Sequence, residues 1–61
     1  MRVSKEPEVR KQEMLDTAMR VFAEKGFEAT TMKDIAAEMN VVSGLCYHYF
    51  QNKQQLYEEA L

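Results

Sequence analysis

The sequence predicts an all-α domain of three short helices followed by the start of a fourth. Apolar residues recur at spacings of three and four, no segment alternates as a strand would, and each break carries a turn or capping residue. Its 61 residues include a single cysteine. A domain this small buries only about 60% of its unfolded surface and here has no internal disulfide. We therefore expect support from further chain or from a partner subunit.

The first predicted helix runs from about Glu8 to Lys25, after a flexible N-terminal arm formed by residues 1–7. Gly26 can take the left-handed conformation that ends a helix, and Phe27 then packs back against the preceding turn. The predicted buried face of this helix recurs at helical spacing: Leu15, Ala18, Met19 and Phe22.

The second predicted helix begins at Thr31, whose hydroxyl can cap the first turn while Asp34 reaches back in a capping box. Asn40 tolerates left-handed geometry and predicts the turn that ends it. Its apolar face is expected to comprise Met32, Ile35, Ala36 and Met39.

The third predicted helix starts near Ser43 and ends by Phe50. One side is expected to be buried, through Val42, Cys46, Tyr49 and Phe50. The opposite side carries Ser43, Gly44, Tyr47 and His48. Asn52 then caps the fourth helix, with Gln55 at the reciprocal box position.

Two short helices joined by a tight turn predict a helix-turn-helix, so that residues 8–51 form a three-helix, homeodomain-like domain. A small residue at Ala36 permits close crossing, and Asn40 supplies the turn. The major groove of DNA is about 12 Å wide and accepts one such helix. This arrangement favours a DNA-binding domain, with a small helical protein–protein interaction module as the alternative.

Charge supports both possibilities. The net charge of −2 suits a protein partner, because DNA-binding domains usually carry a basic field. Its distribution favours DNA, because residues 39–57 contain Lys53 and His48 but no acid.

Residues 15–56 resemble the TetR family of transcriptional repressors. The matching positions are Ala18, Phe22, Gly26, Phe27, Thr30, Thr31, Asp34, Ile35, Ala36, Val41, Gly44, Tyr47, His48, Tyr49, Phe50, Lys53 and Leu56. Three positions depart from the family pattern: Asn40 replaces the usual glycine, Val42 a capping serine, and Leu45 a small polar residue. These departures bear on the operator sequence more than on the function.

The resemblance implies a role for each candidate DNA-binding residue. Tyr47 and Lys53 would bind phosphates, and Thr31 would cap its helix and touch phosphate together. Base edges would be met by Ser43, Gly44, Leu45 and His48, and in some relatives by the residue matching Lys33. Leu45 would contact a thymine methyl or would instead extend the core. The alternative for His48 is an ordinary surface histidine, and the alternative for Lys53 is a solvated lysine.

The resemblance further implies a homodimer on a near-palindromic double-stranded operator. Residues 52–61 would lead into an absent C-terminal domain that dimerises and binds a small-molecule ligand, which releases the DNA. From the residues themselves, no catalytic residue is expected, because Cys46 and His48 point to different helix faces and cannot form a Cys–His nucleophile. No cofactor is expected, and no metal, because no cysteine–histidine cluster has the spacing of metal ligands. Without an apolar run of membrane length, and with one unpaired cysteine, a cytoplasmic protein is expected.

Overall fold

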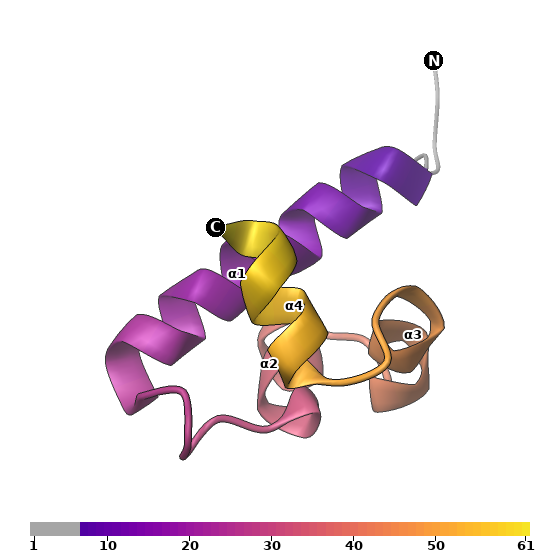
Figure 1. The fold of residues 1–61 in the computed structure, drawn as a ribbon. Helices are drawn as coiled ribbons and strands as arrows, with labels where there is room; N and C mark the ends of the chain where they lie inside the picture. The colour runs from indigo at the N-terminus through magenta and orange to yellow at the C-terminus, as the bar shows by residue number, and fades with distance from the viewer. Residues whose placement is uncertain (1–6) are drawn as a thin grey trace.

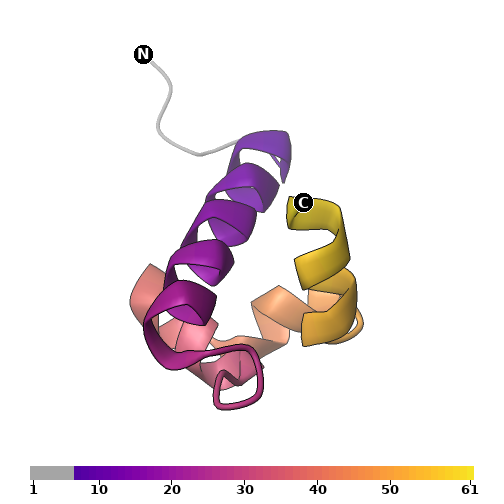
Figure 2. The same cartoon turned by 60° about the vertical axis from the view of Figure 1, so that its left-hand side comes forward.

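The computed structural model describes residues 7–61, and these form four helices (Figure 1). They are α1 (Pro7–Lys25), α2 (Met32–Met39), α3 (Ser43–Tyr49) and α4 (Lys53–Ala60). Helix α1 packs against both α2 and α4, and α2 packs against α3. In both views α2 and α3 lie in the lower half of the picture, and the N-terminal half of α1 rises above them (Figures 1 and 2). The all-α, helix-turn-helix prediction is confirmed.

Helix α1 begins one residue earlier than expected, at Pro7. A proline suits a first helical position because its missing N–H would have no partner there. The rest of the predicted arm, residues 1–6, lies outside the described residues. At the other end of the helix, Gly26 has φ +91° and its N–H donates to the Phe22 carbonyl (2.7 Å). The centroids of the Phe22 and Phe27 rings lie 5.2 Å apart. The predicted stop is confirmed.

The buried face of α1 is wider than the predicted stripe. Met14, Ala18, Val21 and Phe22 are buried, whereas Leu15 and Met19 are half-buried and pack against the margin of the core. The predicted residues and the buried ones both fit a helical period, so the sequence alone does not tell which of them are the most buried. The structure decides it because α1 contacts two other helices.

Helix α2 has the predicted ends. The Asp34 N–H donates to Thr31 Oγ1 (3.1 Å), and the Thr31 N–H donates to Asp34 Oδ2 (3.0 Å), which completes the capping box. Asn40 lies in the left-handed region at φ 60° and ψ 42°. The N–H groups of Asn40 and Val41 donate to carbonyls of the last turn, which satisfies that end of the helix.

Helix α3 corrects one prediction: Val42 is 75% exposed and does not belong to the buried stripe. Val42 is the N-cap, with extended backbone at φ −79° and ψ 151°, and makes no side-chain cap bond. A helical period cannot be extended to a residue that precedes the helix. Three other predicted members face inward, because Cys46 and Phe50 are buried and Tyr49 is half-buried against the core.

Helix α4 is capped as predicted, with Asn52 Oδ1 accepting from the Gln55 N–H (2.8 Å). The return bond differs: Gln55 Oε1 accepts from the Gln51 N–H (2.9 Å), one residue before the cap.

The core lies where α1, α2, α3 and α4 meet. Its buried members are Met14, Ala18, Phe22, Met32, Ile35, Ala36, Cys46, Phe50 and Leu56. The buried polar residue Thr30 donates its hydroxyl to the Gly26 carbonyl (2.7 Å). Among residues 7–61 no buried side-chain N or O lacks a hydrogen-bond partner, so this small core incurs no desolvation penalty of that kind.

Candidate DNA-binding surface

The outward face of α3 is polar and aromatic. Tyr47 is 54% exposed, Gly44 and His48 are also exposed, and Ser43 and Leu45 are half-buried. Cys46, by contrast, is buried, and burial raises the pKa of its thiol. The prediction that Tyr49 faces inward and Tyr47 outward is confirmed.

Two features shape this face. The rings of His48 and Tyr49 meet edge to face with centroids 5.3 Å apart, so the outward histidine packs against an inward-facing neighbour. Gly44 has no atom within 4 Å of the position that a Cβ would occupy, so its small size is not required by packing within this chain.

The first turn of α2 contributes Thr31 and Lys33, both exposed. Thr31 Oγ1 accepts the capping bond from the Asp34 N–H, which leaves the hydroxyl proton free to donate outward. Capping and a contact with phosphate are therefore chemically compatible for this residue. Bonds from the Lys25 ammonium (2.9 Å) and the Thr31 N–H lower the pKa of Asp34, so its carboxylate is ionised at neutral pH.

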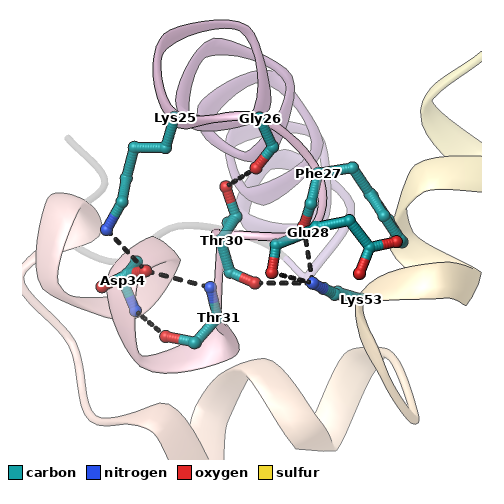
Figure 3. Close-up of polar contacts among 8 residues, drawn as sticks. All are labelled: Lys25, Gly26, Phe27, Glu28, Thr30, Thr31, Asp34 and Lys53. Carbon is teal, nitrogen blue, oxygen red and sulfur yellow. Dashed lines mark hydrogen bonds and ion pairs between the residues drawn. The ribbon is translucent and has the colours of Figure 1, made fainter.

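Lys53 is half-buried, and its ammonium donates to the carbonyls of Phe27 (2.5 Å), Glu28 (3.1 Å) and Thr30 (2.9 Å) (Figure 3). It also lies 4.5 Å from the centroid of the Phe27 ring. The alternative of a plain solvated lysine is therefore wrong, and the phosphate contact stays a prediction. Sequence reasoning missed these carbonyls, since backbone acceptors leave no trace in side-chain identity.

Ion pairs link α1 to α2 and to α4. Arg20 of α1 pairs with Glu38 of α2 (3.0 Å), Lys25 pairs with Asp34 (2.9 Å), and Lys11 of α1 pairs with Glu59 of α4 (3.3 Å). All of these side chains are between about one third and one half exposed, so each pair contributes at most about 1 kcal/mol. Three of the basic residues are thus already matched with acids of the same chain.

Within residues 7–61, no cluster of histidine, cysteine, aspartate and glutamate could hold a metal ion. Nor is any helix in that range both long and apolar enough to span a membrane.

These observations define a class: an all-helical domain whose α2 and α3 form a helix-turn-helix with an outward polar face on α3. The family described as "Bacterial regulatory proteins, tetR family" matches residues 14–60, which is most of the chain. The chain belongs to the TetR family of bacterial regulators.

Relatives agree with this assignment. The chain is 43% identical over 56 residues to the HTH-type transcriptional repressor KstR2 of Mycolicibacterium smegmatis, covering 92% of this chain and 27% of that protein. It is 35% identical over 51 residues to the biofilm operon regulator IcaR of Staphylococcus aureus strain Newman, covering 84% and 27%.

A crystal structure of a HlyIIR mutant protein superposes with a TM-score of 0.89 at 31% identity, covering 95% of this chain and 32% of that one. The chain therefore spans about a quarter to a third of the length of these proteins.

Proposed function

We propose that this chain is the DNA-binding domain of a transcriptional repressor, in which α3 enters the major groove and α2 braces it. The observation that carries the proposal is the outward placement of Tyr47 and His48 on α3, a helix that packs against α2, whose first turn is itself exposed. KstR2 and IcaR, named as a repressor and a negative regulator, supply independent support.

The proposed contacts divide by chemistry. Tyr47 and Thr31 donate hydroxyl protons to phosphate oxygens, which positions the domain without reading sequence. Base edges are contacted by Ser43, Gly44, Leu45, His48 and Lys33. The half-exposed Leu45 suits a thymine methyl group. A side chain at Gly44 would enter the space between α3 and the groove floor, which is why glycine is favoured there although nothing within the chain requires it.

The assembly proposed is a homodimer on a near-palindromic operator, with two α3 helices in successive major grooves about 34 Å apart. A further helical domain supplies the dimer contact and a pocket for a small-molecule ligand that releases the DNA. Support comes from the relatives, whose chains are three to four times longer than the matched segment. Such a regulator acts in the bacterial cytoplasm, at the nucleoid.

Salt dependence separates this function from a protein–protein interaction module, which the net charge of −2 would also suit. Binding to labelled duplexes, selected from random sequence by the protein itself, is measured by fluorescence anisotropy over a range of salt concentrations. We expect log K to fall linearly with log salt, by about 0.9 for each phosphate contacted. No selectable duplex, or a slope near zero, would contradict the proposal.

A further inference from the structure

We infer that Lys53 is a positioning residue that joins the two ends of the helix-turn-helix, and that it does not bind a DNA phosphate. This inference rests on the proposed function, because it concerns how the DNA-binding surface is held in place. It differs from the phosphate contact that the family resemblance implies for this lysine.

The first argument is the count of donors on the ammonium. A lysine ammonium has three N–H donors and no acceptor. In this structure Nζ has three carbonyl partners, on Phe27, Glu28 and Thr30, and lies over the Phe27 ring (Figure 3). To bind a phosphate, it would have to give up at least one of these interactions.

The second argument is where those carbonyls lie in the chain. Thr30 immediately precedes Thr31, the N-cap of α2, and Lys53 immediately follows Asn52, the N-cap of α4. The bond from Lys53 to the Thr30 carbonyl therefore links positions 23 residues apart and encloses all of α2 and α3. One side chain thus connects the point where the helix-turn-helix begins to the point where it ends.

The third argument is that other contacts fix both the loop that carries the three carbonyls and helix α4, which carries Lys53. The Thr30 hydroxyl donates to the Gly26 carbonyl and the Thr30 N–H to the Phe27 carbonyl (3.3 Å), which fixes the loop that presents the acceptors. On the other side, the rings of Phe27 and Tyr57 lie 5.3 Å apart, which packs α4 against the same loop. These contacts bring the three carbonyls to the N-terminal end of α4, where the Lys53 ammonium binds them.

The chemistry of the site favours lysine over arginine. The acceptors belong to three different residues and surround one point, which suits a compact ammonium with three rotatable donors. A guanidinium is a wide planar fork that matches carboxylate or phosphate, and it could replace lysine at a phosphate but not at this carbonyl site. Lys53→Arg therefore distinguishes the two roles while keeping the charge.

The experiment compares the full protein with Lys53→Met, Lys53→Arg and the control Gln54→Met, an exposed neighbour on α4. Affinities for the selected duplex and for a scrambled duplex are measured against salt, at a temperature where circular dichroism shows each protein folded. We expect Lys53→Met to bind the selected duplex about tenfold more weakly, a typical coupling between sites. We also expect a smaller ratio of specific to scrambled binding, an unchanged salt slope, and no rescue by Lys53→Arg.

Two results would overturn the inference. A salt slope reduced by about 0.9 in Lys53→Met, with arginine restoring both slope and affinity, would make Lys53 a phosphate ligand. A lower melting temperature with unchanged affinity of the folded protein would make it merely structural. Should Lys53→Met fail to fold, Lys53→Arg decides by itself, because full affinity in that variant contradicts a carbonyl site.

Amide hydrogen exchange separates this inference from the proposed function. If the parent protein selects no duplex, the proposed function fails, but the exchange of the Thr30, Thr31 and Asp34 amides still reports on the loop. Faster exchange in Lys53→Met than in Gln54→Met supports the connection that Lys53 makes, and equal rates refute it.

Discussion

Replacing Val42 by serine should stabilise the domain, because α3 is the one helix of α2, α3 and α4 whose N-cap makes no side-chain hydrogen bond. In α2 and α4 the third amide donates to the cap side chain, whereas in α3 the Leu45 amide donates to the Val42 carbonyl (3.0 Å). The backbone at Val42 is already extended, as an N-cap requires. A serine hydroxyl can therefore accept this bond without a change of fold.

The expected gain follows from two opposing terms. A good N-cap contributes about 1 kcal/mol over a residue that cannot cap. Val42 is 75% exposed, so about a quarter of a burial energy of about 1.5–3 kcal/mol is lost with its side chain. The net gain in the free energy of unfolding is about 0.5 kcal/mol, which raises the melting temperature by about 2–4 °C for a domain of this size.

Thermal and urea unfolding followed by circular dichroism measure this gain. Val42→Ala removes a similar apolar area without providing an acceptor, so the difference between the serine and alanine variants isolates the cap. Thr31→Ala, which deletes an existing cap, should lose about 1 kcal/mol in the same assay. The reasoning is refuted if serine and alanine at position 42 are equally stable while Thr31→Ala shows its loss.

Three further outcomes are expected. The pKa of Asp34 lies below its ordinary value of 3.8 because Lys25 and an amide bind the carboxylate, so its stabilisation is present above that pH and is lost as pH falls through the lowered pKa. Asp34→Asn should therefore be less stable than the parent at pH 7, with a gap that narrows in urea titrations below pH 3.8; a constant gap would contradict this. The Cys46 thiol, buried and with a raised pKa, should be alkylated by iodoacetamide far more slowly in the native protein than in urea, and equal rates would contradict its burial. Tyr47→Phe should weaken selected and scrambled duplexes alike, whereas His48→Ala should change the sequence selected, and the reverse pattern in anisotropy and selection would exchange their roles.

Local signals in the sequence predicted the helix ends well. The Thr31 capping box, the left-handed Asn40 and the Gly26 stop each depend on residues within a few positions of one another, so composition and spacing suffice to identify them. The outward Tyr47 and inward Cys46 followed from helical period within a single helix. The DNA contacts themselves remain predictions, because they involve a molecule outside this chain.

Features that depend on packing between helices could not be predicted. Met14 and Val21 are buried whereas Leu15 and Met19 are half-buried at the margin of the core, and nothing in the local pattern distinguishes the two pairs. The helical period also predicts a buried Val42, but that period does not apply before the first helical turn. The partners of Lys53 are main-chain oxygens, which every residue possesses.

The ion pairs of Lys11, Arg20 and Lys25 bear on how firmly one domain can hold DNA. Basic side chains that are already paired with acids of the same chain add little to the electrostatic attraction of DNA. A single copy of the domain should therefore bind DNA weakly. In the proposed dimer this weakness becomes useful: two weak attachments on one scaffold multiply through their high local concentration, yet that gain vanishes when their separation no longer matches the operator. A small change in the distance between the copies would then suffice for rapid release.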